Sequence, residues 1–311
     1  GARLGLQQTG FNWQGFAPNA RVIQVDIDQS ELDKGHPAID VGIRADADGV
    51  LKHLLKLPHR ELGSWLAFCE EVRDLLPLSE KSNTRHEGFL NPYDFSLALS
   101  ERCSSNDILI PCSSGGAMTV LMQAFEQKRG QTIVNNKNLA SMGYGLSGAI
   151  GAALAGGGRR TVLTEGDGGF SQNLQELAIV GIRELPLKIF VLANEGYASI
   201  RMTQKNYFGG DSLGCDTSTG LGFPDWTRLF DAYGIAAIEI NDQGLDNQEF
   251  ETLFESPGPA AFIVNVHPEQ SYYPKISSRV LPDGGMESNP LHLLSPDLEE
   301  NVASRVFRFI D

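Results

Sequence analysis

The chain has 311 residues, of which 41% are hydrophobic and 21% are charged, a balance typical of globular proteins. Its formal net charge is −14, and this acidity argues against nucleic acids and anionic membranes as partners, because both require a basic surface. No apolar run approaches the length of a membrane span, so we predict a cytoplasmic protein with no membrane partner. A phosphate-bearing ligand would need a site made locally from backbone N–H groups, helix ends and a metal.

Cysteine and histidine spacing excludes two kinds of chemistry. The cysteines lie far apart without a CxxC pair, and the histidines show no HxH or HExxH spacing. We interpret Cys69, Cys103, Cys112 and Cys215 as buried reduced thiols. Neither a zinc site nor a cysteine nucleophile is predicted.

The first 90 residues read as the end of one α/β unit followed by a connection. A short strand ending in acids is predicted over 21–28, and a helix over 48–57. Apolar residues at helical spacing predict a second helix over 61–76, which ends at a proline. Residues 79–88 are polar and irregular, as in a linker.

From residue 91 onward, predicted helices and strands alternate. Helices are expected over 93–103, 117–127, 145–154, 173–183 and 224–233, and strands over 107–112, 131–134, 160–164, 187–193 and 261–266. Such alternation predicts an α/β fold with a doubly wound, mostly parallel sheet that helices cover on both faces. In sheets of this kind, ligands bind at the carboxyl ends of the strands.

Polar residues follow two of these strands. Asp167 comes between glycines just after one strand, and Asn194 follows the next strand along the chain. The carboxyl ends of parallel strands meet at one sheet edge, where a carboxylate, an amide oxygen and a backbone carbonyl form a ligand set suited to Mg²⁺. Gly168 and Gly169 allow the backbone to approach an anion, and the following helix offers its N-terminus to a diphosphate.

This pattern resembles that of the thiamine diphosphate (ThDP) enzymes, in which Gly-Asp-Gly is followed, after about one helix and one strand, by an Asn-containing strand end. The resemblance implies that Asp167 and Asn194 are side-chain ligands of Mg²⁺ and that Gly196 is a carbonyl ligand. The family's usual Asn-Asn is Ala193-Asn194 here, and the second Asn is the one that corresponds to the ligand.

Two further segments carry the resemblance. Residues 140–145 resemble the segment beneath the thiamine, where Met142 would hold the cofactor bent and the Ala140 carbonyl would accept from its 4′-amino group. The family usually has Gly at the latter position. Residues 112–116 resemble the family's other diphosphate-contacting loop. The resemblance thus assigns cofactor binding to Ser114, Gly115, Ala140, Met142, Gly166, Gly168 and Gly169.

The N-terminal segment narrows the resemblance to acetolactate synthase-like enzymes. Residues 1–3, 15–18 and 25–28 resemble the end of their middle domain, so the similarity covers nearly the whole chain in the family's order. It implies a ThDP-binding fold preceded by part of a second α/β domain. The expected segments are the end of the middle domain (1–57), a helix and linker (58–90), the ThDP diphosphate- and Mg-binding domain (91–270) and a C-terminal tail (271–311).

FAD stays open as a second cofactor. Arg3 and residues 26–28 resemble part of the flavin site of acetolactate synthases. The family's acidic-basic run after the Arg is replaced here by residues 4–8, Leu-Gly-Leu-Gln-Gln.

The resemblance implies that a 2-oxo acid such as pyruvate is decarboxylated and that the acyl anion equivalent is transferred to a second carbonyl. No catalytic residue is predicted in this chain, because in the family the activating glutamate comes from an N-terminal pyrimidine-binding domain of the same or a partner chain. No segment resembles that domain, so we expect the C-terminal part of a chain about twice as long. A homodimer or homotetramer is expected.

The acceptor pocket is predicted from residues that follow Gly196, the last of the expected metal ligands. Ser199 and Thr203 take the positions of a Met and a Trp in plain acetolactate synthases, which implies a wider and more polar pocket. Arg201 lies between them, and its planar guanidinium suits a carboxylate or phosphate on the acceptor.

Three alternatives remain open: a simple 2-oxo acid decarboxylase, a non-catalytic ThDP-binding homologue and a nicotinamide dehydrogenase. The last depends on residues 143–148, which match a dinucleotide fingerprint, with Glu165 at about the right distance beyond it. That fingerprint must directly follow a strand, and the nearest predicted strand ends near Val134.

Overall fold

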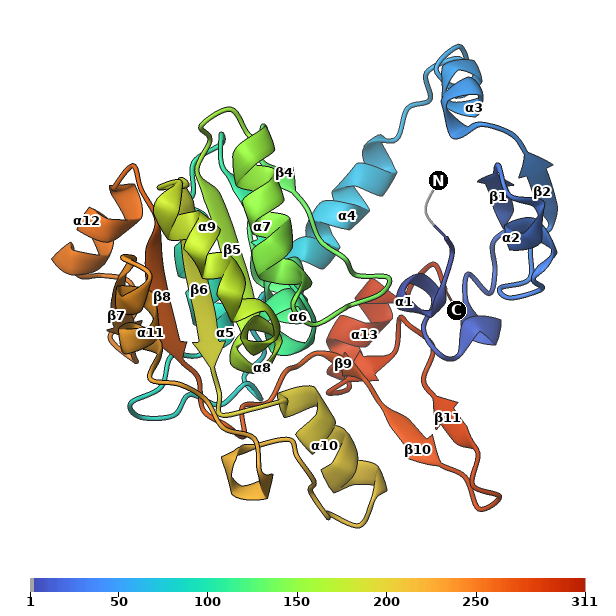
Figure 1. Cartoon of the computed structure of the whole chain (residues 1–311). Helices are drawn as coiled ribbons and strands as arrows, with labels where there is room; N and C mark the ends of the chain where they lie inside the picture. Colours follow the sequence, from blue (N-terminus) through green and yellow to red (C-terminus); the bar gives the residue numbers. More distant parts are fainter. Residues whose placement is uncertain (1–2, 311) are drawn as a thin grey trace. The chain divides into compact units, whose positions relative to one another are not determined.

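The computed structural model describes residues 3–310, so Gly1, Ala2 and Asp311 lie outside the described part, including the first two residues of the predicted middle-domain segment. The chain forms two compact units, and the tail after residue 272 groups with the N-terminal segment (Figure 1). The larger unit spans 78–272, and the smaller one combines 1–77 with 273–311. Within the described residues, every helix is too short or too polar to cross a membrane.

A six-stranded parallel sheet forms the centre of the larger unit (Figure 1). Its order is β4-β3-β5-β6-β8-β7. The strands are β3 (Ile108–Pro111), β4 (Thr132–Ile133), β5 (Thr161–Gly166), β6 (Leu187–Ala193), β7 (Ala236–Ile240) and β8 (Ala260–Asn265). The two long central strands, β5 and β6, pair from Thr161↔Leu187 to Gly166↔Leu192, so they end side by side at one edge.

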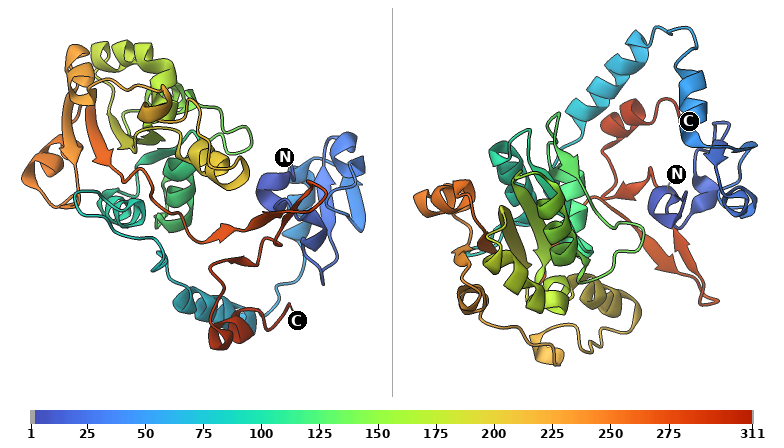
Figure 2. Two further views of the ribbon diagram at one scale, coloured as in Figure 1. Left: turned by 90° about the horizontal axis from the view of Figure 1, so that it is seen from below. Right: turned by 45° about the horizontal axis from the view of Figure 1, so that its top comes forward.

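Helices cover both faces of this sheet, as Figures 1 and 2 show. One buried cluster packs α7 (Tyr144–Ala155), α9 (Leu177–Ile182) and α11 (Trp226–Ala232) against one face. A second cluster packs α5 (Pro92–Arg102), α6 (Gly115–Ala124) and α12 (Gln248–Glu255) against the other. Central strands with apolar residues toward both layers are typical of doubly wound folds. The predicted fold class is confirmed.

Several elements of the larger unit differ from the sequence prediction. The chain after β5 forms a single turn, α8 (Asp167–Phe170), and then a 3₁₀ segment over Ser171–Glu176 before α9 begins. Asn173 has non-helical φ/ψ within that segment, so the predicted helix over 173–183 is shorter than expected. The sequence prediction also omitted β7, α12 and α10 (Ala198–Tyr207).

The smaller unit contains short elements. A parallel pair joins β1 (Ile23–Asp26) and β2 (Val41–Arg44), and antiparallel pairs join β10 with β11 and β9 with β12. The remaining bounds are α1 (Leu6–Thr9), a 3₁₀ turn (Trp13–Gly15), α2 (Gln29–Asp33), α3 (Ala47–Leu54), α4 (Gly63–Leu75), β9 (Lys275–Ile276), β10 (Ser278–Val280), β11 (Met286–Ser288), β12 (Leu294–Ser295) and α13 (Glu300–Val306). Cys69 on α4 is exposed, so the prediction that every cysteine is buried was wrong.

Candidate functional site

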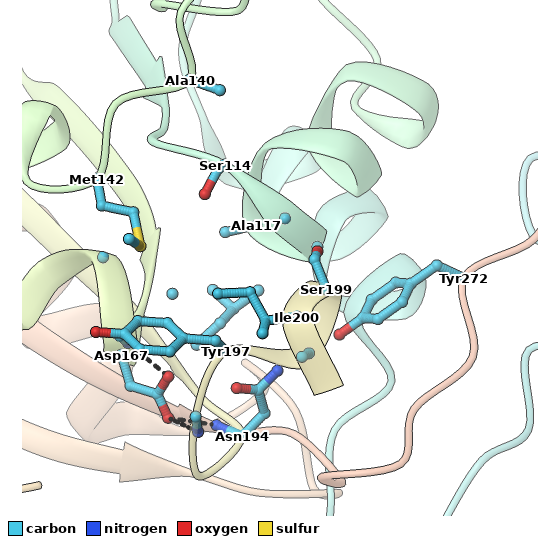
Figure 3. Close-up of a pocket in the computed structure, with 18 residues that line it drawn as sticks. Ser114, Ala117, Ala140, Met142, Asp167, Asn194, Tyr197, Ser199, Ile200 and Tyr272 are labelled. Atoms are coloured by element: carbon cyan, nitrogen blue, oxygen red, sulfur yellow. Dashed lines mark hydrogen bonds between the residues drawn. The ribbon is translucent and has the colours of Figure 1, made fainter. Parts of the chain in front are cut away.

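A pocket lies where β5 and β6 end, beside the start of α6 (Figure 3). Every predicted cofactor and metal residue lines it, together with one of the three predicted acceptor residues. These lining residues are Ser114, Gly115, Ala140, Met142, Gly166, Asp167, Gly168, Gly169, Asn194, Gly196 and Ser199. Segments that are distant in the sequence therefore converge on one cavity of the larger unit.

Asp167 is the only carboxylate among the residues that line this pocket, and it is 1% exposed. The backbone N–H of Gly168 donates to its Oδ1 at 2.6 Å, and those of Asn194 and Gly196 donate to its Oδ2 at 2.9 and 3.2 Å. Burial raises the pKa of Asp167 to about 6, and these backbone donors oppose the rise.

No ion pair involving Asp167 occurs among residues 3–310. A buried carboxylate without a cationic partner is costly, and a bound cation would offset that cost. The same part of the chain contains no cluster of three or more His, Cys, Asp or Glu side chains that could hold a metal. A metal here would therefore depend on one carboxylate and neutral oxygens, a set that fits Mg²⁺.

Two residues of the loop after β6, Asn194 and Gly196, line the pocket together with Asp167. Asn194 follows the last residue of β6, and its side chain lies beside Asp167 (Figure 3). Gly196 has φ of +145°, and a Cβ atom placed on it would lie 2.1 Å from the carbonyl oxygen of Cys215. Only glycine fits this position, because the backbone of the loop after β6 lies so close to Cys215.

An anion could bind the backbone beside this oxygen set. Helix α6 begins at Gly115, whose φ is +64°, and its N-cap residue Ser114 makes no side-chain capping hydrogen bond. The first N–H groups of a ten-residue helix are thus left for another acceptor, as at diphosphate-binding helix starts. Gly168 and Gly169 also line the pocket and add no side chains to it. The residues fit a diphosphate bridged by Mg²⁺.

Replacing Gly168 with Ala should weaken ThDP binding in the presence of Mg²⁺. The added Cβ would lie 2.4 Å from two ring carbons of Tyr197, whose hydroxyl accepts from Gln172 at 3.1 Å. Overpacking against this ring costs roughly 1–3 kcal/mol, and a cost of that size in the bound state corresponds to an affinity loss of about 5- to 150-fold. Calorimetric titration with ThDP checks this. Gly151→Ala in α7 is the matched control, since nothing lies within 4 Å of its added Cβ; equal losses in both variants would contradict the steric argument.

One residue of the segment expected beneath the thiamine has a left-handed backbone conformation. Ala140 has φ of +49°, in the left-handed region that favours glycine. This is the position where the resemblance expects Gly. Met142 also lines the pocket and is 44% exposed, so its thioether is available to a ligand.

A buried carboxyl joins three segments behind the pocket. Glu165, on β5, accepts a hydrogen bond from the Ser113 hydroxyl, and burial raises its pKa to about 7. A Cβ atom on Gly145 would lie 2.3 Å from its Oε2, so the carboxyl lies directly against the first turn of α7. Helix α7 is preceded by a long loop after β4, which ends at Ile133. The glycines of residues 143–148 therefore do not lie in a strand-to-helix turn, as a dinucleotide site with Glu165 as its acidic residue would require.

The three predicted acceptor residues lie in different environments on α10. Ser199 lines the pocket, whereas Arg201 and Thr203 are not among its lining residues. The Arg201 guanidinium donates to the carbonyls of Asn194 and Pro268 and lies 3.8 Å from Asp216 Oδ2. The contact with Asn194 attaches α10 to the loop after β6. A role of Arg201 in reading the acceptor stays a prediction.

Several lining residues were not predicted. Tyr197, Ile200 and Tyr272 contribute side chains to the pocket (Figure 3). Tyr197 directly follows Gly196 in the sequence, so its place in the pocket could have been inferred from the positions of Asn194 and Gly196. Tyr272 follows β8, and no local pattern in the sequence relates it to β6.

Comparisons with known proteins relate the chain to one enzyme family. The sequence model described as "Thiamine pyrophosphate enzyme, C-terminal TPP binding domain" matches residues 114–264. Among curated proteins, the acetolactate synthase isozyme 2 large subunit of Escherichia coli (strain K12) is 29% identical over 301 residues, covering 95% of this chain and 51% of that protein. The isozyme 1 large subunit of the same organism is 27% identical over 280 residues, covering 89% and 48%.

The plant relatives are similar: acetolactate synthase 1, chloroplastic, of Zea mays is 25% identical over 288 residues, covering 89% of this chain and 44% of that protein. The chain spans about half the length of the curated relatives it matches. Among solved structures, the Rhodococcus jostii RHA1 thiamine diphosphate-dependent 4-hydroxybenzoylformate decarboxylase aligns with a TM-score of 0.63 at 19% identity, covering 81% of this chain and 45% of that chain. This last likeness supports the fold.

Proposed function

Because this chain contains the C-terminal TPP-binding domain of the thiamine pyrophosphate enzymes and is acetolactate synthase-like, we propose that it anchors ThDP and Mg²⁺ in an enzyme that decarboxylates a 2-oxo acid. Pyruvate is the expected donor, and the acyl anion equivalent passes to a second carbonyl. The curated relatives, which are acetolactate synthases by name, support the transfer step.

The observation that carries this proposal is the convergence of Asp167, Asn194 and Gly196 at the ends of β5 and β6, next to the open start of α6. When bound, ThDP supplies the electron sink for loss of CO₂. Asp167 and Asn194 would hold the metal by their side chains and Gly196 by its carbonyl. Ser114, Gly115, Gly166, Gly168 and Gly169 would contact the diphosphate.

The chain's other lining residues would place the reactive end of the cofactor. Met142 would support the thiamine, and the Ala140 carbonyl would accept from its 4′-amino group. Glu165 is covered by the first turn of α7 and bonded to Ser113, which does not suit it for activating the cofactor. The activating glutamate would come from an N-terminal pyrimidine-binding domain, of the same or a partner chain, in a homo-oligomer. FAD remains an open second cofactor.

The test is CO₂ release from pyruvate by the full-length protein, with ThDP and Mg²⁺ supplied or withheld. We expect release that requires both, and a new carbon–carbon bond in the product when a second 2-oxo acid or an aldehyde is added. Release with only the free aldehyde as product, whatever acceptor is present, would mean a simple decarboxylase. Bound ThDP without release from any 2-oxo acid would mean a non-catalytic homologue.

A further inference from the structure

The loop after β6 has a backbone conformation that its own residues do not favour. Glu195, between Asn194 and Gly196, has φ of +61°, in the left-handed region that residues other than glycine rarely adopt. Such a conformation is unfavourable and persists where the surrounding structure enforces it. Contacts from outside the loop must therefore hold it in place.

Asp167 supplies part of this support. The N–H groups of Asn194 and Gly196 donate to its Oδ2, as the dashed lines in Figure 3 show. These bonds use the donors of the loop and leave the carbonyl of Asn194 to another partner. That partner is a side chain of α10.

The Arg201 guanidinium joins the loop to two other segments. It donates to the carbonyl of Asn194 at 3.3 Å and to the carbonyl of Pro268, which follows β8, the neighbour of β6 in the sheet. The same guanidinium lies 3.8 Å from Oδ2 of Asp216. Its five N–H donors lie in one plane, a geometry that suits several acceptors at once. Arg201 therefore connects the segments after β6, β8 and α10.

The segment that carries Asp216 supports the loop in turn. The N–H of Tyr197 donates to the carbonyl of Cys215 at 2.8 Å, and Gly196 forms an antiparallel bridge with Asp216. The side chains of Arg201 and Asp216 are each 16% exposed, so salt screens this pair less than a surface pair. Arg201 thus acts on the loop directly, through Asn194, and indirectly, through Asp216.

We propose that Arg201 is a positioning residue that holds residues 194–196 in the conformation that directs their oxygens to a metal. The inference rests on the proposed function, in which Asn194 and Gly196 are metal ligands. Arg201 is not among the residues that line the pocket, so it would touch neither the cofactor nor the substrate. This role differs from reading the acceptor, which the sequence predicts for the same side chain.

The test is the affinity of the full-length protein for Mn²⁺, used as a probe for Mg²⁺ and measured by electron paramagnetic resonance with ThDP present. Removing a positive charge near a divalent cation would by itself strengthen metal binding. Loss of a group that supports metal ligands instead lowers the affinity about 10- to 100-fold, and we expect a loss in this range for Arg201→Met. Unchanged or higher affinity in the folded variant would overturn the inference. If the KM for pyruvate as acceptor rose at the same time, Arg201 would be an acceptor-reading residue.

Two further variants separate position from charge. Lys205→Met removes the same charge from an exposed position on α10 and should leave Mn²⁺ affinity unchanged. Arg201→Lys keeps the charge but not the planar group of donors, so it should lose most of the affinity that Arg201→Met loses. An equal loss in Lys205→Met, or full affinity in Arg201→Lys, would contradict the proposal.

Hydrogen exchange of the metal-free protein tests the position of the loop without any ligand. The amides of residues 194–197 should exchange faster in Arg201→Met than in the unmodified protein, while those of β3 exchange equally in both. Equal exchange at residues 194–197 would overturn the inference. If the unmodified protein bound no Mn²⁺ with ThDP, the proposed function itself would fail, and the exchange result would still report on the loop.

Discussion

Replacing Asp167 with Asn is expected to weaken Mg²⁺-dependent ThDP binding by about 100-fold or more, since even residues behind a metal ligand contribute 10- to 100-fold. The substitution removes the carboxylate charge from the pocket. It also places an NH₂ group among the N–H donors of Gly168, Asn194 and Gly196, which then lose an acceptor. Calorimetric titration of ThDP at fixed Mg²⁺ measures the loss directly.

Asp211→Asn is the control for Asp167→Asn. Asp211 is an exposed carboxylate in the loop after α10, so its replacement changes the net charge equally and should leave ThDP affinity unchanged. Thermal unfolding without ligands would show whether the Asp167 variant still folds. Full Mg²⁺-dependent affinity in a folded Asp167→Asn protein would contradict the assigned role of the carboxylate.

Replacing Lys188 with Met should lower the free energy of unfolding by about 2–3 kcal/mol, because its charged amine satisfies buried oxygens that would lose their donor. The three N–H groups of the Nζ atom have four acceptors within 2.7 to 2.8 Å, which are the carbonyls of Leu253, Ser256 and Gly258 and the Ser256 hydroxyl. These contacts join the centre of the sheet to the end of α12. Chemical denaturation of both proteins measures the difference.

The Lys188 replacement should also change how stability depends on pH. Burial lowers the pKa of Lys188 from 10.5 to about 8, so between these values the unfolded chain holds this proton and the folded protein does not. Stability from this group therefore rises as the pH increases from about 8 to 10.5. The rise should be absent in Lys188→Met and preserved in Lys205→Met, an exposed lysine on α10. A rise of equal size in the Lys188 variant would contradict this assignment.

Much of the larger unit could be predicted because its sequence patterns are local. The buried strand β6 was expected over 187–193 and is observed as Leu187–Ala193. The glycines and polar residues after β5 and β6 indicated a site at the sheet edge, where the structure brings Asp167 and Asn194 together. Parallel pairing of these two strands makes this convergence a consequence of topology.

The omissions have physical reasons. Helix α10 buries none of its residues, so it has no apolar stripe by which to recognise it. Strand β7 is an edge strand of the sheet and is only partly buried. Its short sequence therefore shows little difference between buried apolar and exposed polar positions. Tyr272 lines the pocket only through the tertiary fold, and Arg201 is directed to the carbonyls of Asn194 and Pro268 by contacts that local spacing does not show.

The most direct test of the central claim is a crystal structure of the protein with ThDP and Mg²⁺. We expect the metal to be bound by the carboxylate of Asp167, the amide oxygen of Asn194 and the carbonyl of Gly196. The diphosphate should lie between Gly168 and the first turn of α6. A diphosphate bound outside this pocket, or a metal held by other residues, would contradict the account.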